Sequence, residues 1–154
     1  MGIPFDYYEH PEAPTIEVAA RFYRGEGTTL CKNLFFRNHK GNRHYLVIMD
    51  SRHAMDIHDM EHRLHQGKLS FASPERMMRY LGVQPGSVSL FTLVNDVNHE
   101  VFLFVDSHLL DAEKVSFHPN DNHASLVISR DDMLRFIKEI GNPYEVTDLY
   151  DTNG

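Results

Sequence analysis

The distribution of hydrophobic and polar residues over positions 29–50 is that of a β-hairpin. The segment reads TLCKNLFFRNHKGNRHYLVIMD, in which two mainly apolar runs flank a polar turn that contains Gly41. Lys32 and Asn33 stand side by side within the first apolar run. Since neighbouring residues of a strand point to opposite faces of a sheet, each face receives one of these polar side chains.

Four segments carry the apolar spacing or the end signals of a helix. Residues 15–23 place apolar side chains on one face after a threonine cap, and residues 51–67 run from a serine cap to a glycine stop. Residues 73–82 begin with Ser-Pro and end with glycine, which is strong helix punctuation. Residues 129–141 begin with a serine cap and also end at a glycine.

Strand-like segments separate these helices. Residues 3–9 have the pattern of a strand, and residues 99–106 form a continuous apolar run with polar ends, which indicates a central strand. Residues 116–129 hold an irregular loop followed by another strand, and residues 108–115 suggest a short helix. The apolar run within residues 83–96 follows a turn and does not indicate one type of element.

The irregular alternation of strands and helices predicts the α/β (α+β) class, with one mixed β-sheet and helices packed on it. We expect a single domain over residues 1–142, followed by a loose C-terminal tail over residues 143–154. No internal repeat, linker or low-complexity segment interrupts the pattern.

Composition narrows the class of protein. The 154 residues are 42% hydrophobic, which is enough for a core, and the single cysteine, Cys31, excludes an internal disulfide. No apolar run is long enough to span a bilayer, so we expect a cytoplasmic protein without a membrane partner. The formal net charge of −7 argues against a protein that coats long nucleic acids, but it allows contact with one RNA end.

The eleven histidines prompt a search for a metal site. The stretch HDMEH, from His58 to His62, fits the H-x-x-E-H zinc-protease pattern, and His65 follows on the same helix face. No clear distant third ligand accompanies it, and so short a pattern arises easily in a histidine-rich chain. We therefore expect a solvated helix face and no functional metal. A metal-dependent hydrolase built on His58 and His62 remains an alternative.

Cys31 is a candidate nucleophile, which would need a nearby base and an activating environment. A lone cysteine beside a leucine in a strand is more often a small buried hydrophobe. Two loops could also face a ligand. Gly86 in GVQPGS would permit close approach of the backbone, and FHPNDN would present His118, although both stretches are equally consistent with ordinary turns.

Lys32 and Asn33 have a structural and a functional interpretation. In the structural one, Lys32 extends to the sheet edge and Asn33 closes a local hydrogen bond. In the functional one, the cost of burying an unpaired ammonium, several kcal/mol, requires an anionic or carbonyl partner that a substrate could supply. The residues alone leave both interpretations open.

Three stretches together resemble a known family. CKNLFFRNHKGNRHYLVIM, KLSFASPERMMRYLGVQPGSVSLFTLVND and FHPNDNHASLVIS, followed by DMLRFI, are similar to the YbaK/prolyl-tRNA-synthetase-associated domain family. Within it they resemble the free-standing branch of ProX/PrdX-like alanyl-tRNA(Pro) deacylases. The resemblance covers roughly residues 2–140, and LSFASPERMMRYLGVQPGSV is its most specific block.

The resemblance implies an aminoacyl-tRNA deacylase with the same fold and with no metal or organic cofactor. Its partners would be the acceptor end of a mischarged tRNA and prolyl-tRNA synthetase; an oligomeric state is not indicated. The residues that match the family's catalytic positions are Lys32, Asn33 and His118. Those that match its substrate loops are Gly82, Pro85, Gly86, Ser87 and Asn120.

The resemblance also implies a chemistry that needs no strong nucleophile, because an aminoacyl ester is already activated. Lys32, Asn33 and loop N–H groups would hold the ester and stabilise the oxyanion, while water attacks with help from the tRNA 2′-hydroxyl. His118 would position the substrate, and a small pocket would select alanine over proline. A non-catalytic module that binds aminoacyl-tRNA or an amino-acid-like ligand is the alternative.

Docking of an acceptor end also needs local positive charge. The residues that offer it lie on the hairpin and in the segment 68–79; they are Lys40, Arg43, His44, Lys68, Arg76 and Arg79.

Two features depart from the family pattern. Leu90 and Thr92 stand where relatives often have proline and glycine, which puts the shape of the substrate loop and the choice of amino acid in question. Relatives also usually carry a helix before the first strand, whereas Met1 and Gly2 begin at the end of that helix.

Overall fold

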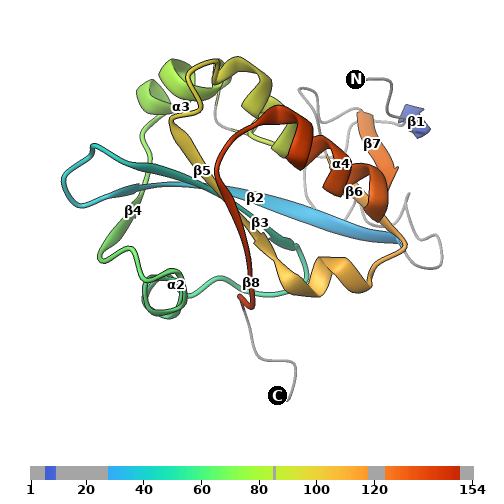
Figure 1. The fold of residues 1–154 in the computed structure, drawn as a ribbon, viewed down its shortest axis with the longest axis horizontal. Coiled ribbons are helices and arrows are strands. Elements are labelled where there is room, and N and C mark those ends of the chain that lie inside the picture. The colour runs from blue at the N-terminus through green and yellow to red at the C-terminus, as the bar shows by residue number, and fades with distance from the viewer. Residues whose placement is uncertain (1–5, 10–27, 85, 118–123, 150–154) are drawn as a thin grey trace.

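The computed structural model describes residues 6–9, 28–84, 86–117 and 124–149 (Figure 1). Its strands form an eight-stranded sheet in the order β1-β7-β6-β2-β3-β5-β8, with β4 paired to β2 off this path. The strands are β1 (Asp6–Glu9), β2 (Thr28–Asn38), β3 (His44–Asp50), β4 (Leu69–Phe71), β5 (Val101–Asp106), β6 (Lys114–Phe117), β7 (Ala124–Ser129) and β8 (Tyr144–Thr147). The helices are α2 (Ile57–Leu64), α3 (Pro74–Leu81) and α4 (Arg130–Ile140), with 3-10 helices η1 (Leu90–Asn95) and η2 (Ser107–Asp111).

The sheet is mixed, which confirms the predicted α/β (α+β) class. β2 and β3 form the predicted antiparallel hairpin, whereas β3 with β5, β5 with β8, and β2 with β6 run parallel. β3 lies between β2 and β5 and is buried along its whole length. The carboxyl ends of β3, β5 and β8 therefore meet at one edge of the sheet.

Each face of the sheet has its own apolar core. In Figure 1, α3 and α4 lie above the central strands and α2 lies below them. The larger core joins the sheet to α3, η1 and α4 and contains Phe35 and Leu90. The smaller core joins Phe36 to Met60 and Leu64 of α2. Consecutive residues of β2 thus enter different cores, as the period of a strand requires.

Capping residues define α3 and α4 as the sequence predicts. The Ser73 hydroxyl accepts a hydrogen bond from the Arg76 N–H, and the Ser129 hydroxyl accepts one from the N–H of Asp132. Gly82 ends α3 with a φ of 68°, in the left-handed region that glycine adopts without strain. The predicted ends of both helices are confirmed.

α2 is shorter than the predicted 51–67 helix. Asp56 rather than Ser51 caps it, because the Asp56 carboxylate accepts hydrogen bonds from the N–H groups of His58 and Asp59. His65, with a φ of 57°, ends the helix before Gly67 is reached. The sequence indicated the helix correctly but not its boundaries.

The apolar run within residues 83–96 contains η1, whose first turn is held by a capping box. The Ser89 hydroxyl accepts from the Phe91 N–H, and the Ser89 N–H donates to the Thr92 hydroxyl over 3.4 Å. The Thr92 hydroxyl also donates to the Ser89 carbonyl over 2.5 Å. Leu90 is fully buried and Thr92 is 4% exposed. The two residues that depart from the family pattern therefore pack and cap this element. The short helix suggested over 108–115 is correct only for its first part, which is the 3-10 helix η2 (Ser107–Asp111); Lys114 and Val115 belong to strand β6.

The predicted loose tail over residues 143–154 is wrong for its first part. Tyr144–Thr147 form β8, which pairs in parallel with β5, and Leu149 is buried in the smaller core. These residues gain a sheet partner that local sequence does not reveal.

The helix predicted over residues 15–23 lies outside the described residues. No helix in the described segments has the length and apolar character that crossing a membrane requires.

Candidate active site

Lys32 lies on the face of the sheet that α2 covers, directly opposite Met49 of β3. Its Nζ donates a hydrogen bond to the backbone carbonyl of His53, in the loop after β3. Burial lowers the pKa of Lys32, and nearby Asp50 opposes this effect. An ammonium has three N–H donors, and the His53 carbonyl is its one hydrogen-bond acceptor in the described part of the chain. Lys32 thus has a partner within the chain and keeps donors for another.

Asn33 points to the opposite face, towards α3, η1 and α4. It lies opposite Ile48, a residue of the larger core. Its Oδ1 atom is buried and has no hydrogen-bond partner among the described residues. A buried acceptor without a partner costs about 1–3 kcal/mol, so this amide does not serve the stability of the described fold. The local hydrogen bond expected in the structural interpretation is not made by this oxygen.

The edge of β2 that faces away from β3 has strand partners at both ends but not in its middle. β6 pairs with Thr28–Leu30, and β4 pairs with Phe36–Asn38. Over Cys31–Phe35 no described strand pairs with this edge, although the Ala72 N–H donates to the Phe35 carbonyl. Unpaired strand edges offer backbone hydrogen-bonding groups. We call Cys31–Phe35 the open interval, and it contains both predicted catalytic residues of β2.

β6, the strand that precedes His118 in the chain, ends beside the open interval. Ser116 of β6 pairs with Leu30, and β6 ends one residue later, at Phe117. The chain therefore enters FHPNDN next to Cys31 and Lys32. His118 and Asn120 themselves lie outside the described residues, so their predicted roles stay predictions.

The predicted substrate loop follows α3, on the same side of the sheet as Asn33. Gly86 has a φ of 93°, which favours glycine at this position. Apart from its chain neighbours, no described residue places a heavy atom within 4 Å of the position that a Cβ would take. The Ser87 N–H donates to the Gln84 carbonyl and closes a turn. Pro85 lies outside the described residues. Because Lys32 points to the other face, a ligand that contacts both must reach across the edge of β2.

Cys31 is a buried hydrophobe, as the sequence favours. The side chain is 3% exposed. Burial, and then the carboxylates of Asp50 and Asp106, raise the pKa of the thiol far above its usual range. The thiol is therefore protonated at neutral pH and does not have the activated environment that a nucleophile needs.

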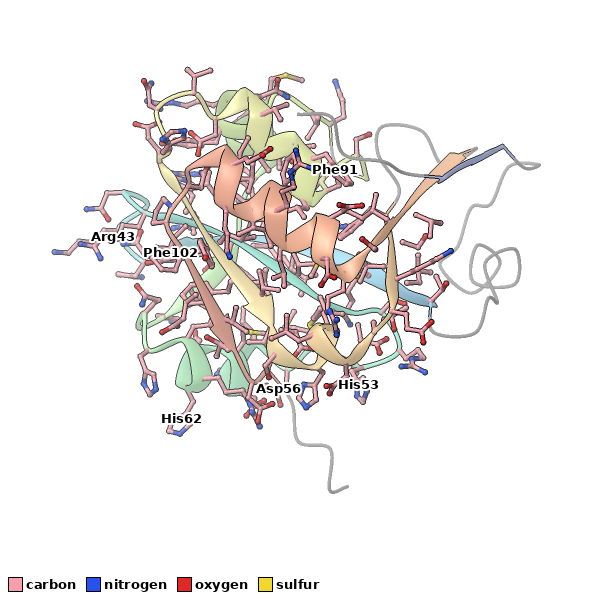
Figure 2. The ribbon with its side chains drawn as sticks, turned by 45° about the vertical axis from the view of Figure 1, so that its right-hand side comes forward. Arg43, His53, Asp56, His62, Phe91 and Phe102 are labelled. Atoms are coloured by element: carbon pink, nitrogen blue, oxygen red, sulfur yellow. The ribbon has the colours of Figure 1, made fainter. Side chains whose placement is uncertain are left out.

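The HDMEH stretch on α2 does not have the arrangement of a zinc protease. Glu61, the glutamate of the pattern, lies 3.2 Å from His58 Nδ1 through one oxygen, and its other oxygen accepts the Leu69 N–H over 2.7 Å. It thereby joins α2 to β4. The His58 side chain is 87% exposed, and His62 points away from the sheet (Figure 2). The stretch is the solvated helix face that the sequence favours.

Positive charge gathers at the tip of the β2–β3 hairpin. A hollow of about 450 Å³ lies between this turn and the loop after α2, and no carboxylate lines it. Its cationic residues are Lys40, Arg43 and Lys68, and none of them takes part in an ion pair within the described segments. Arg43 extends from the tip of the hairpin in Figure 2. We call this site the basic hollow.

His44 does not contribute positive charge, contrary to expectation. It is 2% exposed, its ring lies 4.0 Å from that of Tyr80, and its Nε2 accepts a hydrogen bond from Arg76 over 2.9 Å. Burial, followed by Arg76 and Arg79, lowers the pKa of His44 to about 4. The same Arg76 guanidinium donates to the Gly41 carbonyl, so it also supports the hairpin turn.

Sequence reasoning missed the buried aspartates at the ends of β3 and β5. Asp50 is 3% exposed and its Oδ2 lies 2.6 Å from Arg52 Nη2. Burial by itself raises the pKa of Asp50, but hydrogen bonds from Arg52 outweigh it and lower the pKa. Asp106 is fully buried. An aspartate that directly follows an apolar strand was the available signal, and it occurs in both places.

The chain is similar to proteins of one family. It matches the family described as the aminoacyl-tRNA editing domain over residues 10–136. It is 35% identical over 149 residues to the prolyl-tRNA editing protein ProX of Acetoanaerobium sticklandii, covering 97% of this chain and 91% of that protein. It is 31% identical over 146 residues to prolyl-tRNA synthetase associated domain-containing protein 1 of Mus musculus, covering 92% and 86%.

A solved structure has the same fold. It is described as a candidate trans-editing enzyme for prolyl-tRNA synthetase, and it matches with a TM-score of 0.71 at 22% identity. The match covers 94% of this chain and 86% of that one. At this level of identity the likeness establishes the architecture alone.

Proposed function

The chain belongs to the aminoacyl-tRNA editing domain family, and we propose that it is a trans-editing deacylase that hydrolyses the ester of alanyl-tRNA(Pro). The observation that carries this proposal is the open interval of β2. It holds a partly buried ammonium, which has one hydrogen-bond acceptor in the described segments, and a buried amide oxygen, which has no partner there. Both groups match the residues that the family resemblance assigns to the reaction.

Lys32 acts as the positive charge of the site. The His53 carbonyl fixes the position of its ammonium, which leaves donors for the ester carbonyl or for the terminal phosphate of the tRNA. A charge held in place before the reaction stabilises the tetrahedral oxyanion without further reorganisation. Hydrolysis then needs only a water molecule, because the aminoacyl ester is already activated.

Asn33 binds the substrate and does not stabilise the described fold. Its unpaired Oδ1 is an acceptor and suits the α-ammonium or a hydroxyl of the aminoacyl-adenosine. His118, Asn120 and the backbone of the Gly82–Ser87 loop complete the site in this proposal. The 2′-hydroxyl next to the ester assists the attacking water, which agrees with the protonated, buried Cys31.

The basic hollow contacts the phosphates of the acceptor arm. Lys32 and the hollow residue Tyr45 lie on the same face of the sheet, because Lys32 pairs with Met49 and Phe36 pairs with Tyr45. The hairpin tip lies six residues beyond Lys32 along β2, or roughly 20 Å at the rise of a strand. A chain of net charge −7 can thus receive an RNA end locally.

The direct test is hydrolysis of aminoacyl-tRNA by the purified protein. Alanyl-tRNA(Pro), prolyl-tRNA(Pro) and seryl-tRNA are incubated separately, and ester loss is compared with loss in buffer. We expect rapid loss of the alanyl species and slow loss of the prolyl species, because a small pocket excludes the larger ring. Equal loss of all three would contradict the assigned specificity.

A second candidate is a module of the same fold that binds aminoacyl-tRNA without hydrolysing it. The observation that favours it is the His53 carbonyl, which already gives Lys32 a structural role. In that case the protein would bind alanyl-tRNA(Pro), and every ester would be lost only at the rate seen in buffer. The same experiment, extended by a binding titration, separates the two.

A further inference from the structure

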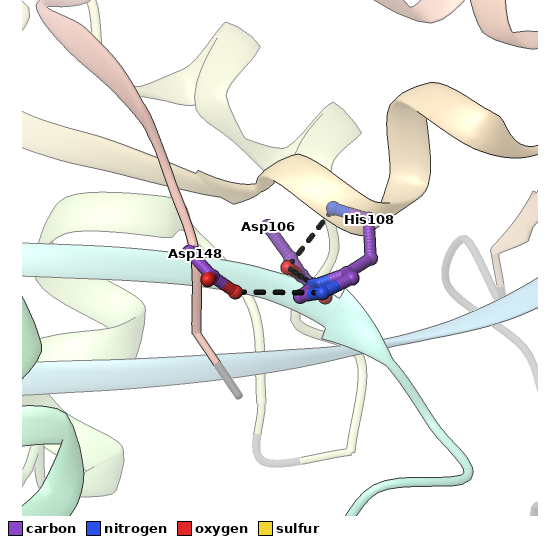
Figure 3. A group of neighbouring side chains, drawn as sticks. All are labelled: Asp106, His108 and Asp148. Atoms are coloured by element: carbon purple, nitrogen blue, oxygen red, sulfur yellow. Dashed lines mark hydrogen bonds and ion pairs between the residues drawn. The ribbon is translucent and has the colours of Figure 1, made fainter. Parts of the chain in front are cut away.

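Three metal-ligating side chains meet where β5 and β8 end (Figure 3). Asp106 is the last residue of β5, His108 lies in η2, and Asp148 follows β8. β5 and β8 run parallel with Asp106 opposite Thr147, which brings Asp148 next to it. In the described segments this is the one group of at least three such residues that could hold an ion.

Asp106 has an oxygen that nothing in the described chain satisfies. The residue is fully buried. Its Oδ1 accepts the His108 backbone N–H over 3.1 Å and lies 2.7 Å from His108 Nδ1, whereas its Oδ2 has no hydrogen-bond partner. A buried carboxylate oxygen is costly unless a donor or a cation compensates it. The orphan oxygen is thus an independent sign of a missing partner.

The geometry points to a site for a divalent transition-metal ion, and we propose that Asp106, His108 and Asp148 bind Zn²⁺ or a similar ion. One atom from each residue lies within 4.8 Å of the other two. Ligands about 2.1 Å from a zinc ion are at most about 4.2 Å apart, so only a small shift of these side chains is needed for all three to reach one ion. The Asp148 side chain is 61% exposed and is able to make that shift.

The donor set determines which ion fits. One imidazole with two carboxylates suits Zn²⁺ or Mn²⁺, whereas Mg²⁺ prefers oxygen ligands and retains its waters. The ion would neutralise the two carboxylates. Asp106 Oδ1 lies 2.7 Å from His108 Nδ1, and Asp148 lies 3.4 Å from Nε2. An ion shared by Asp106 and His108 would therefore take the place of the proton on Nδ1, and Asp148 would turn towards it.

A bound ion would fasten the C-terminal segment to the sheet. Asp148 directly precedes Leu149, which is buried in the smaller core. The ion would add a link between this segment and the end of β5, so its effect is on stability. Neither Lys32 nor Asn33 belongs to the site, and the inference stands or falls independently of the proposed deacylase activity.

The test is a calorimetric titration of the chelator-treated full-length protein with Zn²⁺, Mn²⁺ and Mg²⁺, with thermal unfolding in parallel. We expect one equivalent of Zn²⁺ to bind at micromolar concentration or below, Mg²⁺ to bind at least tenfold more weakly, and the Tm to rise by several degrees. The Asp148→Asn variant alters an exposed side chain and should weaken Zn²⁺ binding at least tenfold.

The histidine-rich helix α2 supplies the control, because exposed histidines bind metal adventitiously. A His58→Gln/His62→Gln double variant should keep the tight equivalent of Zn²⁺. The proposal is overturned if no equivalent binds tightly, or if the tight equivalent survives in Asp148→Asn. Loss of that equivalent in the α2 variant alone would also overturn the proposal, since Zn²⁺ would then bind to the histidines of α2.

Discussion

Single residues of β2 show how one strand can serve both stability and chemistry. Lys32 uses the His53 carbonyl to offset the cost of an ammonium in an apolar strand, which accounts for its presence structurally. Among the described residues, no group offers comparable compensation for the buried oxygen of Asn33. The amide is therefore the stronger sign of a substrate site, because the described part of the fold gives no reason to keep it.

Replacing Asn33 separates these two roles. The Asn33→Leu variant removes the orphan acceptor and keeps the branching and the number of side-chain heavy atoms, so we expect the free energy of unfolding to stay the same or to rise by about 1 kcal/mol. Hydrolysis of alanyl-tRNA(Pro) should fall about 100-fold, the magnitude typical when one hydrogen bond to the oxyanion or the substrate is removed. Urea unfolding and single-turnover deacylation measure the two effects. A clearly less stable protein with normal turnover would mean that Asn33 is structural.

His44 makes stability depend on pH. Its pKa is about 4 in the folded protein, and an unfolded histidine titrates near 6.5. Between these values only the unfolded chain binds the proton, so stability falls as the pH drops from about 6.5 to 4, by at most about 3 kcal/mol. In the His44→Gln variant this loss should be absent. Urea unfolding of both proteins at pH 7.5 and pH 4.5 measures it, and parallel declines would refute the assignment.

At the scale of elements, local signals predicted helices well wherever the cap lay beside the apolar pattern. Ser73, Pro74 and Gly82 determine α3 because their effects are confined to its own ends. The start of α2 was misplaced because Ser51 and Asp56 are both able to cap, and only the Asp56 carboxylate reaches the helix N–H groups. β8 was missed because its support comes from β5, some forty residues away in the chain.

The cap of α3 gives a prediction for an element. The Ser73→Ala variant leaves the Arg76 N–H without its acceptor and should lower the free energy of unfolding by about 1 kcal/mol. The Ser73→Asp variant retains an acceptor and should be close to the wild type. Urea unfolding of the three proteins provides the comparison, and equal losses in both variants would show that an acceptor at this position does not stabilise α3.

At the scale of the whole molecule, the candidate site was only partly predictable. The Lys-Asn pair and the glycine loop were visible because their residue types are unusual in their local pattern. The open interval was not visible, since it arises where β6 stops and β4 begins on the same edge of β2. The buried Asp106 depends in the same way on which strand ends meet.

Charge is also a property of the whole molecule, and it gives a salt-dependent prediction. The Lys40→Gln/Lys68→Gln double variant should weaken binding of alanyl-tRNA(Pro). It should also lower the slope of log affinity against log salt by about 0.7–0.9 for each phosphate that is no longer neutralised. A Lys138→Gln variant, at an exposed position of α4, is the control and should change neither. Unchanged slopes in the double variant would exclude the basic hollow as the RNA-binding surface.

The measurement that tests the central claim most directly is single-turnover hydrolysis of alanyl-tRNA(Pro) by the wild type and by Lys32→Ala. We expect the rate to fall by at least about 100-fold in the variant, because the positive charge at the ester is removed. Urea unfolding of the same preparations shows whether both proteins are folded. A folded Lys32→Ala variant that hydrolyses the ester at the wild-type rate would contradict the account, since the role of Lys32 would then be only its structural hydrogen bond to the His53 carbonyl.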